Sequence, residues 1–292
     1  MAATARRELT ASAVEKRRVA DPTARALRRS LQALVLPAIV VALWWFASAR
    51  GTLPRVFLPG PQKVLGALIE WISGAAVFGD PARAYAGTWL ASVLTSAERV
   101  LAGYVLGSLV GIVVGGLLGY FAWLDHVVEP SIHMLRAIPI IGWLPLSLVF
   151  FGLGIRSAIF LVSLGVVFPV ILNTMAGVRG TQVSLLRVGQ MAGASNLQLI
   201  RYIIVPSALP GIFTGLRVAM GFAWILVIVA EWMAVRTGLG FTLLDSYNFL
   251  RYDYVIAAMI SVGFMGFISD RIVELIFRPV LRWHHETTIE GR

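Results

Sequence analysis

The chain has 292 residues, of which 58% are hydrophobic and only 14% charged, and its mean hydropathy is +0.80. About a quarter of the residues of an ordinary soluble domain are charged, so this composition indicates a protein surrounded by lipid. The chain has no cysteine, which excludes a disulfide scaffold, a thiolate zinc site and an iron–sulfur cluster. A net charge of +10 would suit nucleic-acid binding only if it were considered alone.

Basic residues are concentrated at the N-terminus, immediately before the first apolar run. Such a cluster predicts a cytoplasmic N-terminus by the positive-inside rule, and residues 1–29 are expected to form a cytoplasmic basic arm. Nucleic acid is not an expected partner, because these residues do not alternate with aromatic residues on one face. The following run is about as long as a membrane span and lacks a clear small-residue cleavage site, which argues against a signal peptide. The basic residues of the arm are Arg6, Arg7, Lys16, Arg17, Arg18, Arg25, Arg28 and Arg29.

Long apolar runs predict six membrane spans, since a span needs about 20 residues at a rise of 1.5 Å each. Trp44, Trp45 and Phe46 near the outer end of the first run fit an interfacial aromatic belt. We therefore expect an all-α membrane protein with six transmembrane helices, its transmembrane domain at 30–283 and a C-terminal tail at 284–292. Six spans would place both termini in the cytoplasm. The predicted spans are 30–49, 100–124, 137–155, 157–178, 207–233 and 254–277.

Two longer connections separate these runs. The stretch between Arg50 and Arg99 is expected to be extracytoplasmic and to contain a short interfacial helix. Residues 179–206 are too charged to span a membrane and too long for a hairpin turn, so they predict a substantial cytoplasmic loop. The final residues 289–292 spell a protease cleavage sequence that is often added to recombinant proteins, and they carry no functional argument.

Glycine recurs at every fourth position in the second predicted span. This spacing forms a strip of small residues along one face of a helix, and such a strip lets another helix approach closely. Static packing and a helix that slides during gating are both compatible with the pattern. The strip consists of Gly103, Gly107, Gly111, Gly115 and Gly119.

The third predicted span contains Pro139 and Pro145, with Trp143 between them and Arg136 at its start. Each proline removes a helical hydrogen bond and clashes with the preceding turn. Irregular backbone at membrane depth requires protein or a water-filled cavity around it, so these four residues are candidates for lining a translocation pathway. A kinked packing helix is the alternative interpretation.

The loop at 179–206 carries the most specific pattern of the chain. Its local sequence indicates a helix, a glycine turn and a second helix, and Pro206 is well placed in the first turn of the fifth span. An exposed helical hairpin on the cytoplasmic side is suited to docking a partner. The residues of this predicted coupling loop are Ala192, Gly193, Ala194, Ser195, Ile203 and Pro206.

The spacing of glycine, nine residues, isoleucine, two residues and proline resembles the EAA loop of ABC-importer permeases, and the flanking sequence resembles their nitrate/sulfonate/taurine branch. The resemblance extends over about residues 54–283. It implies a type I ABC importer permease (MetI-like) fold. The segments that carry it are Leu58-Pro59-Gly60-Pro61, Trp143-Leu144-Pro145, Asn173 to Arg179, Pro206 to Arg217, Ala230-Glu231 and Gly238-Leu239-Gly240.

The resemblance also implies partners and a location. The expected partners are a second permease copy, two cytoplasmic ATPase subunits that dock on the coupling loop, and a periplasmic or lipid-anchored substrate-binding protein. The expected location is the bacterial inner membrane. ATP and Mg²⁺ would be bound by the ATPase rather than by this chain. One departure stands out: Arg187-Val188-Gly189 occupies the place of the usual Glu-Ala-Ala.

Ionisable groups inside spans are costly and are functional candidates by default. Arg217 and Glu231 lie in the fifth span, roughly 21 Å apart along the helix axis, so their partners must come from other helices. A cation facing the pathway would suit an anionic solute, and Arg217 and Arg136 are the candidates; Glu231 is a further pathway candidate. Snorkelling or a helix-end ion pair is the competing interpretation. Asp270, Arg271 and Glu274 form a cluster of structural type.

Motifs for chemistry are missing from the sequence. The only lysines, Lys16 and Lys63, are not followed by Ser or Thr, so there is no phosphate-binding loop, and no catalytic cluster or metal-site spacing is visible. We expect a transporter subunit rather than an enzyme, with no cofactor or metal of its own. An ion-coupled secondary transporter is the alternative, although no internal repeat supports it. A membrane-embedded enzyme is a third, weaker interpretation.

The substrate is not readable from the sequence alone. Taurine or another alkanesulfonate is favoured, because residues 248–251 resemble the corresponding segment of sulfonate permeases. Nitrate, bicarbonate or a heterocyclic vitamin precursor remain open.

Overall fold

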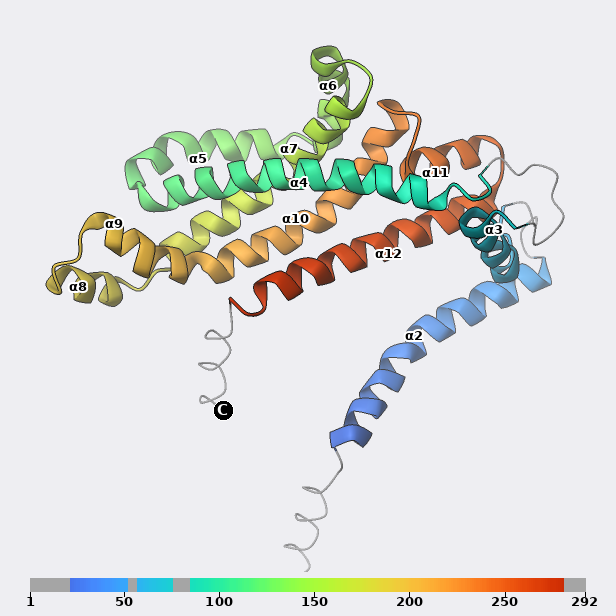
Figure 1. The fold of residues 1–292 in the computed structure, drawn as a ribbon, viewed down its shortest axis with the longest axis horizontal. Coiled ribbons are helices and arrows are strands. Elements are labelled where there is room, and N and C mark those ends of the chain that lie inside the picture. The colour runs from blue at the N-terminus through green and yellow to red at the C-terminus, as the bar shows by residue number, and fades with distance from the viewer. Residues whose placement is uncertain (1–21, 52–56, 76–84, 281–292) are drawn as a thin grey trace, which may run out of the picture. The chain divides into compact units, whose positions relative to one another are not determined.

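The computed structural model describes residues 22–51, 57–75 and 85–280, and all of their regular structure is helical (Figure 1). The predicted basic arm lies largely outside the described residues, and the C-terminal tail, 284–292, lies entirely outside them. The elements are α2 (Pro22–Arg50), α3 (Pro61–Ser73), α4 (Trp89–Tyr120), α5 (Ala122–Ala137), the 3₁₀ turn η1 (Ile140–Trp143), α6 (Leu144–Phe151), α7 (Ile155–Arg179), α8 (Val183–Met191), α9 (Asn196–Leu199), the π-helical turn η2 (Ile200–Ile204), α10 (Val205–Met233), α11 (Leu239–Asn248) and α12 (Tyr252–Phe277).

The chain divides into two compact units, residues 1–63 and 64–292. In the first unit, the segment after α2 folds back onto the C-terminal part of that helix. The indole Nε1 of Trp44 donates to the carbonyl of Pro59 at 3.1 Å, and the hydroxyl of Ser48 donates to the carbonyl of Leu58 at 3.3 Å. The Leu-Pro-Gly-Pro segment is thus held against α2 by two hydrogen bonds.

Four described helices are long and apolar enough to cross a membrane: α4, α7, α12, and the continuous helix Asn196–Met233, which joins α9, η2 and α10. The prediction of six spans is therefore not met in the part of the chain that the structure describes. The bent pair α5 and α6 brings the number to five if the pair counts as one span, and the described apolar part of α2, Val35–Arg50, is shorter than a span. The predicted fourth and sixth spans agree closely with α7 and α12.

The predicted third span, 137–155, is broken at Pro139, as its prolines indicated, but it divides into two helices rather than forming one kinked helix. The helical segments on either side of Pro139 meet at 89°, because this proline forces an extended backbone on Ile138 (φ −73°, ψ 121°) and ends α5. Pro145 lies in the first turn of α6, where its missing N–H breaks no helical hydrogen bond. The two prolines thus begin and end short elements rather than kinking a long one. In Figure 1, α5 runs back along α4 and α6 turns away from it.

The second span begins earlier than predicted. The sequence placed it at 100–124 because Arg99 appeared to mark the membrane boundary, whereas α4 starts at Trp89 and carries Arg99 as a buried side chain. The charge is tolerated inside the helix because a carboxylate from another helix compensates it, as described below.

The glycine strip of α4 is the surface on which α7 packs. A Cβ atom at Gly111 would lie 2.7 Å from Cβ of Val170, and one at Gly103 would lie 2.7 Å from Cβ of Val162. The contacts pair every fourth residue of α4 with every fourth residue of α7 in the same order, so the two helices run parallel. The β-branched partners on α7 are Val162, Val166, Val170, Thr174 and Val178. Whether this interface slides during transport stays a prediction.

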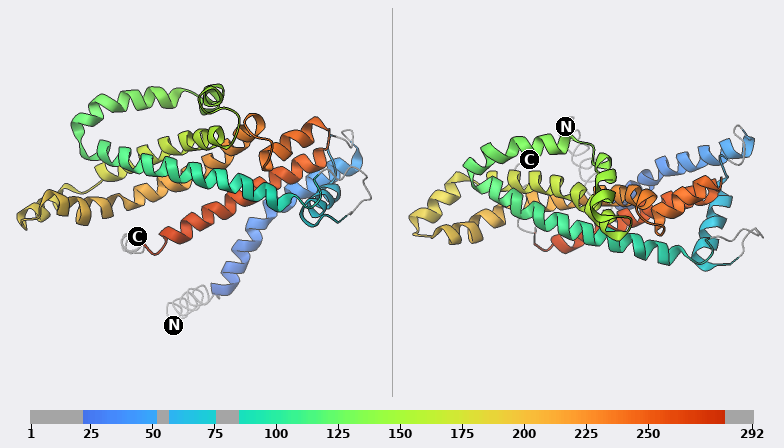
Figure 2. Two further views of the ribbon diagram at one scale, coloured as in Figure 1. Left: turned by 45° about the horizontal axis from the view of Figure 1, so that its top comes forward. Right: turned by 90° about the horizontal axis from the view of Figure 1, so that it is seen from above.

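Helix α7 is the central helix of the second unit. Its opposite face packs against α10 through further small residues, with a Cβ at Gly211 meeting the carbonyl of Asn173 at 2.7 Å. Half of the apolar window of α7 is buried, compared with 17% for α12. The α8–α9 hairpin lies at one end of this unit and α11 at the other, in both views of the bundle (Figure 2). Helix α12 therefore leaves most of its apolar surface for lipid or a further subunit.

Candidate functional site

The predicted coupling loop has the geometry of a helical hairpin. Helix α8 ends at Met191, Gly193 turns the chain with a φ of +76°, and α9 begins after Ser195. Ser195 and Gln198 form a reciprocal capping box: the hydroxyl accepts from the Gln198 N–H, and the Gln198 side chain accepts from the Ser195 N–H. This cap explains why a helix of four residues forms so close to the turn. Gly193 is required because a left-handed φ costs any side-chain-bearing residue about 1–2 kcal/mol.

The tip of the hairpin presents apolar side chains to the outside. Met191 is 81% exposed and Leu197 is 73% exposed, and these two residues flank the turn. No residue of α8 is buried. Exposed large apolar residues that are gathered on a protruding element mark a surface for a partner.

Gly189 explains how the unusual Arg-Val-Gly segment is accommodated. A Cβ at this position would lie 2.7 Å from Cδ2 of Leu199 and 2.8 Å from Cδ1 of Ile203. The missing side chain therefore lets α8 lie close to α9 and η2. Its partners are the flexible ends of side chains, so an alanine could be accommodated by a small shift. Arg187, two residues earlier, is exposed on the hairpin.

Pro206 lies in the first turn of α10, as predicted, but the helix does not begin there. The π-helical turn η2 precedes it, so α9, η2 and α10 form one continuous helix of 38 residues. A π-turn inside an α-helix is rare and is frequently found at functional sites. The hairpin is thus rigidly continuous with a membrane span, and Ile203 lies on the connecting turn.

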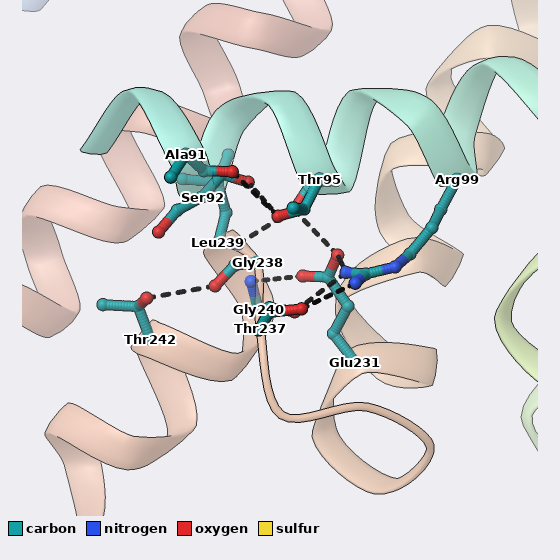
Figure 3. A network of polar contacts seen from close by, with 11 residues as sticks. Ala91, Ser92, Thr95, Arg99, Glu231, Thr237, Gly238, Leu239, Gly240 and Thr242 are labelled. Carbon is teal, nitrogen blue, oxygen red and sulfur yellow. Dashed lines mark hydrogen bonds and ion pairs between the residues drawn. The ribbon is translucent and has the colours of Figure 1, made fainter. Parts of the chain in front are cut away.

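A second polar site surrounds Glu231, which is fully buried near the C-terminal end of α10 (Figure 3). Its Oε1 accepts from Nη1 of Arg99 at 2.6 Å and from the hydroxyl of Ser96 at 2.7 Å, both on α4. Its Oε2 accepts from the N–H of Gly240 at 2.7 Å, in the first turn of α11. Arg99 also donates to the carbonyl and hydroxyl oxygens of Thr237 at 2.8 and 2.7 Å. One carboxylate therefore joins α4, α10 and α11.

The Gly238-Leu239-Gly240 segment is shaped around this carboxylate. Gly238 has a φ of +113°, and an added Cβ there would run into the Glu231 side chain. A Cβ at Gly240 would lie 2.7 Å from Cα of Ile228. The N–H of Leu239 donates to the hydroxyl of Ser96 at 2.9 Å. The N-terminus of α11 thus supplies one backbone donor to the carboxylate and a second to the hydroxyl of Ser96, and anions are commonly bound at helix N-termini.

The sequence model of the family described as "Binding-protein-dependent transport system inner membrane component" matches residues 103–282, more than half of the chain. The chain belongs to this family. It is the membrane-spanning permease of an ABC importer, and the alternative of an ion-coupled secondary transporter is not favoured. Permeases of this family are transport subunits of the inner membrane and not enzymes themselves, and the family implies an ATPase and a substrate-binding protein as partners.

Two relatives show the range of solutes in the family. The permease is 33% identical over 251 residues to the taurine transport system permease protein of Escherichia coli (strain K12), covering 85% of this chain and 88% of that protein. It is 33% identical over 258 residues to the nitrate import permease protein of Synechococcus elongatus (strain ATCC 33912 / PCC 7942 / FACHB-805), covering 87% and 91%. Among solved structures, an inward-facing MetNI methionine ABC transporter shares the fold with a TM-score of 0.51 at 20% identity, covering 64% of this chain and 95% of that one.

The structure gives the predicted pathway residues of the permease different surroundings. Arg217 is 38% exposed in its side chain and forms a bidentate pair with Asp270 of α12, at 2.8 Å from Nε and 2.6 Å from Nη2, with Glu274 3.6 Å away. Glu231 pairs with Arg99. The prediction that both would find partners on other helices is confirmed. Their roles in the pathway stay predictions, and both charges are compensated within the described structure.

The other pathway candidates lie around the break between α5 and α6. Arg136, Pro139 and Pro145 are exposed. Trp143 packs with Leu144 against a cluster contributed by α7 and α10, and its indole N–H is buried with no acceptor among the described residues. The structure therefore places these four residues on one irregular segment, at a distance in sequence and space from the hairpin (Figure 1).

Three residues of this site, Arg99, Ser96 and Thr237, were not predicted from the sequence. Arg99 resembled only the edge of an apolar run. The signal that could have found it is the opposite charge at Glu231 in another apolar run, because a buried charge needs a partner. No sequence spacing joins the two residues, which are 132 positions apart.

Proposed function

We propose that the permease forms the translocation channel of an importer that carries a small anionic solute, with taurine or another alkanesulfonate favoured over nitrate or bicarbonate. A second copy of the chain completes the channel, and two ATPase subunits bind ATP and Mg²⁺ on the cytoplasmic side. Both termini of the permease lie in the cytoplasm. A periplasmic or lipid-anchored binding protein delivers the solute from the other side.

The observation that carries this proposal is the exposed hairpin at 183–199. Its tip exposes Met191 and Leu197, its turn is held by Gly193 and Ser195, and its second helix continues without a break into α10. A force applied to the tip by an ATPase would therefore move a membrane-spanning helix. The sequence between Arg179 and Pro206 contains no acidic residue, so we expect the docking cleft of the ATPase to carry acidic groups near Arg187.

A second copy is supported by the surface of α12. Only 17% of its apolar window is buried, and aromatic residues such as Phe264 and Phe267 are exposed along it. Two-fold symmetric dimers are the commonest homo-oligomers, and an uncovered helix face is suited to forming such a dimer. The preference for sulfonates is supported by the relatives, which include permeases for taurine, aliphatic sulfonates and nitrate.

The test is a substitution at the hairpin turn with a matched control. Gly193→Glu introduces a bulky charge at a positive φ in open space, and Gly152→Glu does the same at a φ of +72° between α6 and α7, also in open space. We expect both variants to insert in the membrane and only Gly193→Glu to lose co-purification of the ATPase and solute uptake. If Gly193→Glu retains both, the docking assignment is wrong.

A further inference from the structure

Helix α11 lies at the end of the bundle opposite the hairpin (Figure 1). Two pockets adjoin it: the smaller lies between α11 and the N-terminal part of α4, and the larger between α11, the end of α10 and the loop before α7. Their volumes are about 370 and 630 Å³. These values are within the range of about 300–1,000 Å³ that is usual for small-molecule sites. The two pockets share four lining residues: Arg236, Thr237, Phe241 and Asp245.

Most hydroxyl groups that line the smaller pocket already donate a hydrogen bond to a backbone carbonyl. Thr88 donates to the carbonyl of Tyr85 at 2.7 Å, Ser92 donates to the carbonyl of Thr88 at 3.1 Å, and Thr242 donates to the carbonyl of Gly238 at 3.0 Å. Thr95 likewise donates to backbone carbonyls of its own helix. A hydroxyl carries a single proton, so these groups offer a ligand only their lone pairs. They make the wall polar without making it a donor surface.

The side-chain donors that remain at the smaller pocket belong to Arg236 and Thr237. Arg236 is exposed, and no hydrogen bond or ion pair joins it to another residue in the described ranges. Its guanidinium therefore has five N–H groups available to a ligand. The hydroxyl of Thr237 accepts from Arg99 at 2.7 Å, which leaves its own proton directed elsewhere. By contrast, Arg99 and Arg217 already form ion pairs with Glu231 and Asp270.

An acid lines the same pockets. Asp245 accepts a hydrogen bond from the hydroxyl of Tyr85 through Oδ2. Burial, and then this hydrogen bond, raise the pKa of Tyr85 to about 12, so the phenol stays a donor at neutral pH. A carboxylate accepts about four hydrogen bonds, so Asp245 has capacity left. No ion pair joins Asp245 to Arg236 in the described structure, although both residues line both pockets.

We propose that the wall shared by the two pockets binds a small zwitterion, an aminoalkanesulfonate. Arg236 would contact the sulfonate and Asp245 the ammonium group. A simple anion would satisfy Arg236 but would lie beside the carboxylate of Asp245, which repels it. A dipolar solute compensates both side chains at once. The inference rests on the proposed importer function, because that function puts a sulfonate on this side of the bundle, and it narrows the substrate class from small anions to zwitterions.

The experiment measures equilibrium binding of radiolabelled taurine to the purified full-length permease in lipid nanodiscs, without ATPase or binding protein. Ethanesulfonate, which lacks only the amino group, serves as competitor. We expect saturable taurine binding, with ethanesulfonate at least about 10-fold weaker, as for the loss of one charge-assisted hydrogen bond. Arg236→Gln should weaken both ligands by about 10-fold or more, and Asp245→Asn should bring the two affinities close together.

Exposed charges outside the pocket provide the matched controls: Glu98→Gln on α4 and Arg278→Gln after α12 should bind as the unmodified chain does. The absence of saturable binding, equal competition by ethanesulfonate, or an unchanged ratio in Asp245→Asn would overturn the assignment. ATP-driven uptake by the complete transporter is measured separately. Sulfonate uptake without binding to the permease defeats the pocket alone, whereas binding without any uptake of sulfonates defeats the proposed function.

Discussion

Neutralising Glu231 should destabilise the permease strongly, because it leaves a buried cation without its partner. Arg99 is 5% exposed and Glu231 is fully buried, and Nη1 of the arginine lies 2.6 Å from Oε1 of the carboxylate. Removing one member of such a buried pair costs about 3–5 kcal/mol, since the desolvated charge that remains is uncompensated. The variant Glu231→Gln keeps the size of the side chain and removes only its charge.

A double-mutant cycle separates this effect from general disruption. Glu231→Gln and Arg99→Met should each cost several kcal/mol. The double variant removes both charges and leaves an amide whose oxygen can accept from the N–H of Gly240 while its NH2 group faces the hydroxyl oxygen of Ser96. We therefore expect the double variant to be more stable than the sum of the two single effects predicts, by at least about 2 kcal/mol. Glu98→Gln, at the exposed neighbouring position, should change stability by less than about 0.5 kcal/mol.

Thermal unfolding of the purified permease in nanodiscs of one lipid composition is the assay. The single variants should unfold at temperatures lower by roughly 6–20 °C, and the double variant at a smaller decrease than their sum. Strict additivity, or single variants that unfold at the unmodified temperature, would refute the view that Arg99 and Glu231 compensate each other inside the bundle.

The glycine strip and the second ion pair give two further predictions. Gly111→Ala should destabilise the permease by about 1–3 kcal/mol, because its Cβ would lie 2.7 Å from Val170. Gly116→Ala, on the open face of α4, should be neutral or stabilising by up to about 1 kcal/mol. Thermal unfolding compares the two variants, and equal effects would contradict the packing argument. Arg217→Gln should cost about 1.5–3 kcal/mol of stability through its lost hydrogen bonds to Asp270. The double variant Arg217→Gln/Asp270→Asn should lose less stability than the two single variants added together. A double variant whose loss equals that sum would show that the pair is uncoupled.

The sequence predicted the elements whose signals are local. A run of apolar residues reports a membrane helix wherever it occurs, so α7 and α12 were located to within two residues at each end. The hairpin was predictable for the same reason, because a glycine turn followed by a cap is decided within a few residues. Prolines also act locally, and the break near Pro139 was anticipated, although its 89° bend into two separate helices was not.

What the sequence by itself determined is where backbone hydrogen bonds can be satisfied along the chain, and hence the helices, their breaks and the coupling hairpin. Only the tertiary structure decided where a charge can be buried. Arg99 looked like a boundary because a charge in lipid is costly, and it became part of a span because Glu231 reaches it from 132 positions away. The same holds for Arg236 and Asp245. The two charges line the same pockets without forming an ion pair, and this depends on how α4, α10 and α11 pack together, which no local sequence pattern specifies.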